Sequence, residues 1–175
     1  MQAEKFMQEF TDGNTLVLCG DAPFMDSETI ANALKLHEAQ ENAVTVITAT
    51  LEQPTGYGRI LRSETGIAAI VEEKDATDAQ REIHEVNSGA YWFKTKALLE
   101  LLGNLSQSNA QGEYYLTDIV GLAVAEGLPV HTAQPAGEWE VLGVNSKVQL
   151  AELERQHQRN LADQLLVAGV RLADP

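Results

Sequence analysis

Residues 16–51 read LVLCGDAPFMDSETIANALKLHEAQENAVTVITATL, and this stretch decides the fold class of the chain. The apolar run 16–19 predicts a short buried strand, which ends at Gly20-Asp21. An amphipathic helix is expected over 27–40, and the β-branched residues of 44–51 predict a second strand. Strands that alternate with helices in this way are typical of an α/β fold.

The same alternation continues along the rest of the chain. Capping residues mark the helix starts, with Asp26 or Ser27 before the first helix of this stretch and Asn145 or Ser146 before the last helix. Further strands are expected at 59–62, 67–72, 86–93 and 130–133, further helices at 1–10, 95–102 and 117–126, an exposed polar connection at 73–85, and a new extended segment at 170–172.

The last helix, over 146–169, shows the clearest periodicity. Two histidines, His37 in the first helix and His157 in the last, lie on apolar stripes and are predicted to be structural. Self-association through the stripe of the last helix is a further expectation. That stripe consists of Leu150, Leu153, His157, Leu161, Leu165 and Ala168.

Charge and composition exclude several classes of function. The 175 residues include 12 Lys and Arg against 26 Asp and Glu, which gives a net charge of −14 and a pI of about 4.5. A general nucleic-acid binder or a protein that docks on anionic membrane needs a basic surface instead. No apolar run approaches the ~20 residues of a membrane span, and residues 1–10 lack the apolar region of a signal peptide. A cytoplasmic location is therefore expected, and the single Cys19 excludes an internal disulfide.

Two glycine-containing motifs are candidates for ligand binding. Gly20-Asp21 follows a strand, where a carboxylate can hold Mg²⁺ against a nucleotide phosphate, although the spacing alone favours a simple turn in which Asp21 caps the next helix. Gly56-Tyr57-Gly58 allows a ligand to approach the backbone closely, and an ordinary hairpin loop is the alternative.

Four polar positions have both a binding and a structural interpretation. Glu72 closes an apolar run and can accept hydrogen bonds from sugar hydroxyls, or it belongs to a solvated charge run. Asn87, inside an apolar strand, bonds a ligand or satisfies neighbouring backbone. Tyr115 can contact a ligand, whereas Thr117 is a candidate N-cap. Asn145 is either an N-cap or an oxygen ligand for a metal ion.

Other chemistries find no support in the sequence. There is no H-E-x-x-H zinc motif and no G-x-S-x-G nucleophile elbow. Cys19 ends a predicted buried strand, so packing is a better explanation for it than nucleophilic catalysis.

Taken together and in this order, the motifs resemble a bacterial enzyme family. Its members are bifunctional, with N-acetylglucosamine-1-phosphate uridyltransferase and glucosamine-1-phosphate N-acetyltransferase activities. The resemblance covers nearly the whole chain. Its most specific parts are Gln111–Asp118, within the matching stretch Asn109–Asp118, and the segment from Gly143-Val144-Asn145 to Pro175. The other matching stretches are Cys19-Gly20-Asp21, Pro54–Ile60, Ile70–Ala76 and Glu85–Gly89.

The resemblance implies a Rossmann-like nucleotide-diphospho-sugar transferase fold that binds its substrates over the strand ends. It implies that Asp21 and Asn145 hold Mg²⁺, and that Cys19 and Gly20 lie against the nucleotide through their backbone. The family often has an aromatic residue where Cys19 stands, which matters little for a backbone contact. The other substrate-binding residues that it implies are Gly58, Glu72 and Asn87 at the N-acetylglucosamine, with Tyr115 and Thr117 near its sugar or phosphate.

The implied reaction is attack by a phosphate oxygen of N-acetylglucosamine-1-phosphate on the α-phosphorus of UTP. It gives UDP-N-acetylglucosamine and releases pyrophosphate. No catalytic acid or base is expected, since positioning and charge neutralisation can supply the rate. Two alternatives stay open: a nucleotidyltransferase for another sugar-1-phosphate, and a non-catalytic chain that binds sugar nucleotide or self-associates.

The resemblance also implies a domain organisation for the chain. Residues 1–145 are expected to form an N-terminally truncated uridyltransferase domain, 146–169 a linker helix, and 170–175 the start of a left-handed β-helix that lies beyond the chain. The family's glycine-rich loop, which holds the triphosphate of UTP, would lie upstream of Met1. Weak or absent catalysis is expected for this reason.

Overall fold

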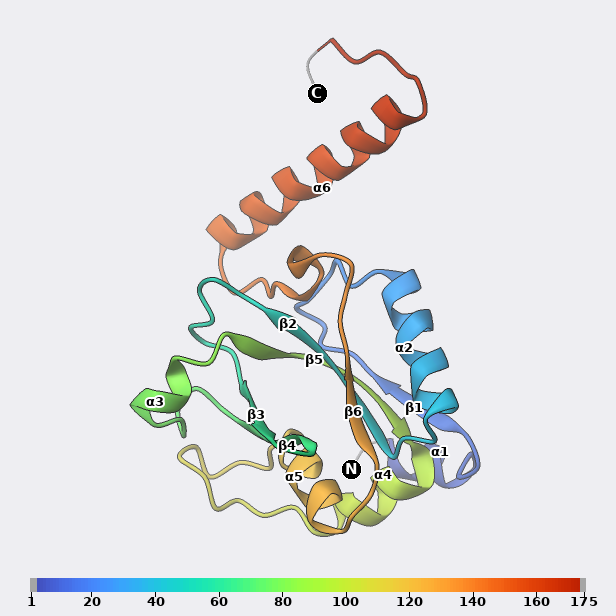
Figure 1. Ribbon diagram of the computed structural model, residues 1–175, viewed down its shortest axis with the longest axis vertical. Helices are drawn as coiled ribbons and strands as arrows, with labels where there is room; N and C mark the ends of the chain where they lie inside the picture. Colours follow the sequence, from blue (N-terminus) through green and yellow to red (C-terminus); the bar gives the residue numbers. More distant parts are fainter. Residues whose placement is uncertain (1–2, 174–175) are drawn as a thin grey trace.

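The computed structural model describes residues 3–173 and shows a mixed sheet with helices on both faces (Figure 1). The predicted α/β fold class is thereby confirmed. The strands are β1 Asn14–Val17, β2 Val44–Thr50, β3 Arg59–Ser63, β4 Gly66–Val71, β5 Glu85–Lys94 and β6 Val130–Ala133. The helices are α1 Glu4–Gln8, α2 Ser27–Ala39, α3 Asp78–Arg81, α4 Thr95–Leu102, α5 Asp118–Ala125, the 3-10 helix η1 Glu138–Val141, and α6 Lys147–Val167.

Strand β5 is the centre of the sheet, whose strand order is β4-β3-β5-β2-β6 with β1 also paired to β5. One edge of β5 is covered by antiparallel β2, from Val44 opposite Phe93 to Thr50 opposite Glu85. The other edge is divided between β1, which pairs with residues 91–94, and β3, which begins opposite Val86. Both are antiparallel to β5, so β1, β2 and β3 run in the same direction, together with β6, which is parallel to β2.

Between β1 and β3, the edge of β5 is left without a neighbouring strand. The Asn87 N–H donates to the Gly58 carbonyl at 2.8 Å, the last backbone bond on the β3 side. The next N–H on this edge, that of Gly89, donates to the Asn87 Oδ1 at 3.0 Å. Asn87 therefore satisfies neighbouring backbone, as one of its two sequence interpretations predicted, and the edge needs no further strand there.

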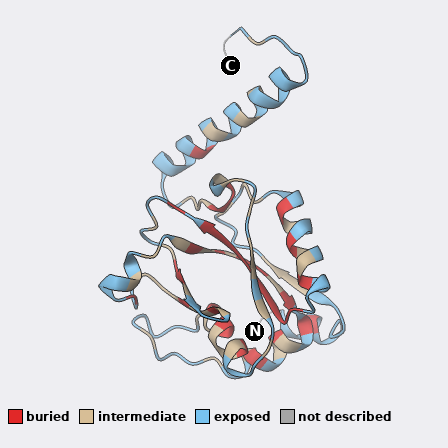
Figure 2. Ribbon diagram, viewed as in Figure 1, coloured by how far each residue is buried: buried red, intermediate tan, exposed pale blue. Residues whose placement is uncertain are grey.

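Alternating residues of β5 form the two sides of the core. Tyr91 and Phe93 pack with buried residues of α1, α4 and α5, whereas Ala90 and Trp92 pack on the other face with Ala33 of α2. The Trp92 Nε1 donates to a backbone carbonyl of α2 at 3.0 Å, which satisfies the indole inside the sheet–helix interface. The buried residues accordingly concentrate along the central strands and the inner faces of these helices (Figure 2).

Strand β1 differs from its prediction. The run 16–19 was expected to be a buried strand, but β1 ends at Val17, and both Leu18 and Cys19 are exposed. The reason is that β1 is short and, in the part of the chain that the structure describes, pairs with β5 alone. The explanation of Cys19 as a packing residue of a buried strand is therefore wrong.

Helix α6 extends away from the sheet (Figure 1) and is mostly solvated. The hydroxyl of Ser146, not Asn145, caps it by accepting the N–H of Gln149 at 3.2 Å. Of the residues in α6, all of which are described, Leu153 alone is buried. The stripe residues Leu161 and Leu165 are 45% and 46% exposed, so self-association through this stripe stays a prediction.

Three other expectations need correction. His157 is exposed rather than part of the core, and its ring stacks on Phe24 at 5.2 Å. Helix α1 buries Met7 but leaves Phe6 and Phe10 exposed, and the first two residues of the helix predicted at 1–10 lie outside the described part. Residues 170–172 form no regular strand, and Asp174-Pro175 lie outside the described residues.

The connection 73–85 was also expected to be exposed throughout. It contains the short helix α3, whose N-cap Thr77 forms a reciprocal capping box with Gln80. Ala76 is buried, and Glu73 forms an ion pair with a buried arginine. No helix in residues 3–173 combines the length and the apolar character that a bilayer crossing needs.

His37 lies fully buried on the inner face of α2, as its place on the apolar stripe predicted. Its Nδ1 is 3.0 Å from the Thr45 Oγ1, and Thr45 also accepts the Asn42 amide at 2.9 Å. The Nε2 has no hydrogen-bond partner among the described residues. Burial, together with the charge of Lys94, lowers the pKa of His37 from 6.5 to about 4.

The lowered pKa of His37 predicts that acid destabilises the fold. Between about pH 6.5 and pH 4 the unfolded chain binds a proton on this histidine and the folded chain does not, so the free energy of unfolding falls as the pH falls. We expect a loss of about 2 kcal/mol between about pH 7 and pH 5, measured by urea unfolding. His37→Gln should remove most of this loss, whereas the exposed-site control His157→Gln should keep it. An unchanged loss in His37→Gln would contradict the assignment.

Candidate active site

Three loops meet at one end of the sheet because β1, β2 and β6 run in the same direction. The backbone N–H of Val144, in the loop after β6, donates to the Asp21 carbonyl at 2.8 Å in the loop after β1. The N–H of Gly143 donates to the phenol oxygen of Tyr57 at 3.0 Å, in the loop after β2. These contacts place the first, second and last of the sequence-predicted motifs beside one another, as expected for loops at the ends of parallel strands.

Asp21 and Asn145 face a common space. A Cβ placed on Gly143 would lie 3.8 Å from the Asp21 Oδ2 and also 3.8 Å from the Asn145 Nδ2. Neither side chain caps a helix: Asp26 caps α2 by accepting the Glu28 N–H at 2.7 Å, and Ser146 caps α6. The capping interpretations of Asp21 and Asn145 are therefore wrong, and both oxygens are available for another partner.

The residue types of this pair fit a hard divalent cation. A carboxylate and an amide carbonyl offer the oxygen ligands that Mg²⁺ accepts, and Mg²⁺ is commonly held by one or two carboxylates together with substrate phosphates. Within residues 3–173, no group of three or more His, Cys, Asp or Glu side chains is arranged to hold a metal ion. A cation at Asp21 and Asn145 would thus depend on substrate oxygens to complete its coordination.

Gly89 lies opposite Cys19 in the gap between β1 and β3. Gly89 has a φ of +78°, and a Cβ there would overlap the Cys19 Sγ. The Cys19 thiol also donates to the Gly89 carbonyl at 3.5 Å. Although Cys19 as a residue is exposed, its thiol group is partly desolvated, and this desolvation, assisted by the negative charges of Asp21 and Glu72, raises the pKa of the thiol, so the thiolate is disfavoured.

Glu72 and Thr117 form the opposite wall. The Thr117 hydroxyl donates to the Glu72 Oε1 at 2.9 Å, and it makes no capping hydrogen bond to any described residue. Thr117 thus occupies the predicted N-cap position of α5, but its hydroxyl bonds Glu72 instead of capping the helix. A Cβ placed on Gly58 would lie 3.1 Å from the Ile70 Cγ2 and 3.4 Å from the Glu72 Oε2, so a glycine keeps this corner open.

Tyr115 stands two residues before Thr117 and is half-buried. Its hydroxyl donates to the Gln111 Oε1 at 3.1 Å. Burial and the nearby carboxylate of Asp75 raise the pKa of the Tyr115 phenol, so it stays protonated and can donate a hydrogen bond. Asp75 also accepts the backbone N–H of Ala110 at 2.8 Å and so holds the loop that carries Tyr115.

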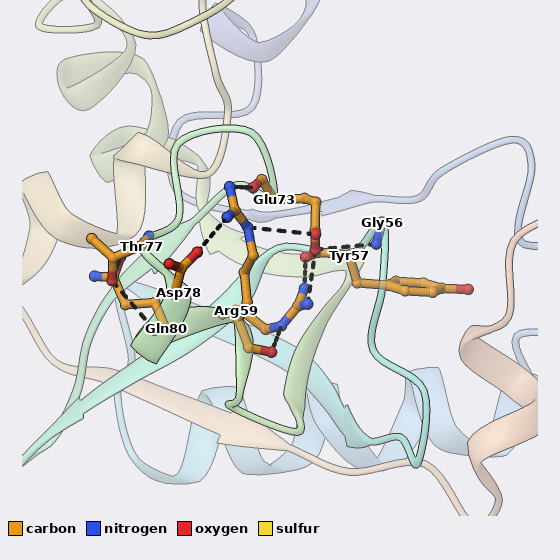
Figure 3. A network of polar contacts seen from close by, with 8 residues as sticks. Gly56, Tyr57, Arg59, Glu73, Thr77, Asp78 and Gln80 are labelled. Atoms are coloured by element: carbon orange, nitrogen blue, oxygen red, sulfur yellow. Dashed lines mark hydrogen bonds and ion pairs between the residues drawn. The ribbon is translucent and has the colours of Figure 1, made fainter.

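Sequence reasoning missed three charged residues that hold these loops. Arg59, 1% exposed, pairs with Glu73 at 2.8 Å (Figure 3). Glu140, also 1% exposed, accepts the N–H groups of Asp26 and Gly137, both at 3.2 Å. Arg59 directly follows the glycine loop and Glu140 lies between Trp139 and Val141, and no local pattern distinguishes either residue from a solvated charge.

Comparison with known proteins agrees with this geometry. A family model described as nucleotidyl transferase matches residues 1–157. The chain belongs to the nucleotidyl transferase family. Bifunctional protein GlmU of Dechloromonas aromatica (strain RCB) is 62% identical to this nucleotidyl transferase over 162 residues, which are 92% of the chain and 35% of the relative. Bifunctional protein GlmU of Janthinobacterium sp. (strain Marseille) is 51% identical over 175 residues, which are 100% of the chain and 38% of the relative.

The nucleotidyl transferase chain thus spans about a third of the length of the curated relatives it matches. The resemblance drawn from the motifs is confirmed. A solved glucose-1-phosphate thymidylyltransferase from Bacillus anthracis, in complex with a sucrose, superposes with a TM-score of 0.69 at 20% identity. The superposition covers 89% of this chain and 57% of the thymidylyltransferase chain. The likeness confirms the nucleotidyltransferase fold.

Gly89 yields a prediction about the gap. Gly89→Ala should destabilise the protein by about 1–3 kcal/mol, because alanine is strained at positive φ and its methyl group meets Cys19. Gly127→Ala is a matched control, since Gly127 has a φ of +71° with nothing within 4 Å of a Cβ. It should cost about 1 kcal/mol.

A double-mutant cycle separates the two costs at Gly89. Adding Cys19→Ala to Gly89→Ala should recover the steric part and leave the backbone part, as measured by denaturant unfolding. Additive effects of the two substitutions would contradict the close approach of Cys19 and Gly89.

Proposed function

We propose that this chain carries the sugar- and metal-binding part of a UDP-N-acetylglucosamine pyrophosphorylase. The reaction is uridylyl transfer from UTP to N-acetylglucosamine-1-phosphate with release of pyrophosphate. One observation carries the proposal: the Asp21 and Asn145 side chains lie together at Gly143, close to where Cys19 meets Gly89 of β5, and the Glu72–Thr117 pair lies at Gly58 on the β3 side of the gap. Family membership and the GlmU relatives support it.

The metal-binding role falls to Asp21 and Asn145. Nucleotidyltransferases use a divalent metal, and we propose Mg²⁺ for this chain. When bound, Mg²⁺ would supply positive charge that neutralises substrate phosphates. This matters because the chain has a net charge of −14, which by itself opposes the approach of polyphosphates. Cys19 and Gly20, which precede Asp21, would contact the nucleotide through their backbone.

The sugar-binding role falls to residues of the other wall. Glu72 uses its Oε1 for the Thr117 hydroxyl, and the Oε2 retains acceptor capacity for a sugar hydroxyl or amide. Asn87 accepts the Gly89 N–H on its Oδ1 and donates one amide hydrogen to the Tyr91 phenol, which leaves the other amide hydrogen to donate. Gly58 keeps the space between them open, and Tyr115 can donate to a sugar or phosphate oxygen from the α5 side.

The chemistry asks little of these side chains beyond position. A phosphate oxygen of the sugar phosphate forms the new bond to the α-phosphorus of UTP, the bond from that phosphorus to the bridging oxygen breaks, and pyrophosphate leaves. No proton has to be removed from the attacking oxygen, which is already ionised at neutral pH. The residues of both walls would hold the two reactants in line, which is the larger part of catalysis in such transfers.

The arrangement of the longer chain is also a proposal. Residues 1–145 would form the uridyltransferase part, and α6 would link it to the segment that begins near residue 170. A different sugar-1-phosphate remains the alternative substrate, because the wall residues recognise hydroxyl and amide groups that several sugars share.

The metal-binding role predicts the effect of Asp21→Asn. Titration calorimetry with UDP-N-acetylglucosamine should show binding that Mg²⁺ strengthens in the unmodified chain. In Asp21→Asn the affinity in Mg²⁺ should fall by about tenfold or more, because an amide binds Mg²⁺ far less well than a carboxylate. Asp163→Asn, on the exposed face of α6, is the matched control and should bind normally.

Two outcomes would count against the proposal. If Asp21→Asn and the unmodified chain bind UDP-N-acetylglucosamine with equal affinity in Mg²⁺, Asp21 does not hold the metal. Tighter binding of another UDP-sugar than of UDP-N-acetylglucosamine would favour the alternative substrate. Pyrophosphate release from UTP and N-acetylglucosamine-1-phosphate, measured on the same variants, tests the reaction itself.

A further inference from the structure

Arg59, like Glu140, is an almost completely buried charged residue beside the candidate site. It is 1% exposed and pairs with the Glu73 carboxylate at 2.8 Å. Its guanidinium also donates to the backbone carbonyl of Tyr57 and, at 3.4 Å, to that of Arg81. A fully buried guanidinium with several acceptors holds its surroundings in one arrangement, because moving any acceptor would leave a buried charge unpaired.

Glu73 connects this guanidinium to the glycine loop. Its carboxylate accepts the backbone N–H of Gly56 at 3.2 Å (Figure 3). The Nε of Arg81 lies 3.8 Å from the same carboxylate. Burial alone would raise the pKa of Glu73, but the Gly56 N–H and the charge of Arg59 together lower it, so the carboxylate is ionised at neutral pH. Arg59 and Glu73 therefore enclose the segment 56–58 from both of its ends.

The two residues that this arrangement fixes are the sugar-binding candidates. Gly58 directly precedes Arg59, and Glu72 directly precedes Glu73. Glu73 is turned toward Arg59 while Glu72 is turned toward Thr117 and Gly58. Both residues stand where β4 passes into the turn 72–75, which the Asp75 N–H closes by donating to the Glu72 carbonyl at 3.0 Å. Because Glu73 is adjacent to Glu72 in this turn, the ion pair with Arg59 also holds the backbone that carries the Glu72 side chain.

We propose that Arg59 and Glu73 are positioning residues that set the sugar-binding wall of the site, while the metal-binding wall is held independently. The inference rests on the proposed function. Independent support of the other wall comes from Glu140, which bonds the backbone of Asp26 and Gly137 and does not touch the Arg59–Glu73 pair. The hydrogen bond from Gly143 to Tyr57 joins the two walls directly.

The inference predicts a selective loss of sugar affinity. Glu73→Gln keeps the size of the side chain and an acceptor for Gly56 but removes the charge that pairs with Arg59. We expect UDP-N-acetylglucosamine with Mg²⁺ to bind about tenfold more weakly, because a small misplacement of a positioned group has effects of this size or larger. UDP with Mg²⁺, which lacks the sugar, should bind within about twofold of the unmodified chain.

Two further variants make this test specific. Arg59→Lys keeps the charge but loses the forked geometry, and it should show the same selective loss. Arg62→Gln is the matched control, because it removes the other ion pair of β3, that with Glu85 at 2.6 Å, which lies away from the glycine loop. It should leave both affinities unchanged.

Amide hydrogen exchange provides a readout that needs no ligand. Exchange at Gly56, Tyr57 and Gly58 should accelerate in Glu73→Gln and stay unchanged in Arg62→Gln. Sugar affinity that Glu73→Gln leaves intact, or equal losses for UDP and UDP-N-acetylglucosamine, would overturn the inference alone. Absence of UDP-N-acetylglucosamine binding by the unmodified chain would overturn the proposed function and this inference together.

Discussion

The arrangement of the molecule depends on one constraint: the backbone edge of β5 is divided between β1 and β3. Strand β2 pairs with one edge of β5 along its length. On the other edge, the gap is bordered by the C-terminal end of β1 and the N-terminal end of β3. The Asn87 side chain satisfies the backbone N–H left between them, so the gap persists without a bridging strand. The segment that follows β1 and the segment that precedes β3 belong to the two walls of this gap.

Buried charges maintain these walls, each in a different way. Arg59 and Glu73 form an ion pair that encloses the glycine loop, whereas Glu140 uses its two oxygens to join the loop after β6 to the start of α2. Burying a charge is costly unless all its hydrogen bonds are made, so such residues specify one local structure strongly. The two walls are joined by the hydrogen bond between the Gly143 N–H and the Tyr57 phenol oxygen.

Much of this could be predicted from the sequence, because periodicity and capping chemistry are local. Helices α2, α4 and α5 and strands β2 and β6 lie where the pattern placed them, and the Gly20-Asp21, Gly58, Glu72 and Asn145 motifs do gather at one end of the sheet. What failed depends on distant partners. Exposure of Cys19 follows from the edge position of β1, the Thr117 hydroxyl is taken by Glu72 from 45 residues away, and the burial of Arg59 follows from a partner on another segment. No window of sequence around these residues contains that information.

The most direct test of the account is to locate the metal. Mn²⁺ substitutes for Mg²⁺ at oxygen sites and broadens NMR signals of nearby amides. In the presence of UDP-N-acetylglucosamine, Mn²⁺ should selectively broaden the amides of Gly20, Asp21, Val144 and Asn145, and those of α6 beyond Leu161 should stay sharp. Broadening centred instead on Asp75 and Asp118, or equal broadening with and without the sugar nucleotide, would contradict the assignment of the metal-binding wall.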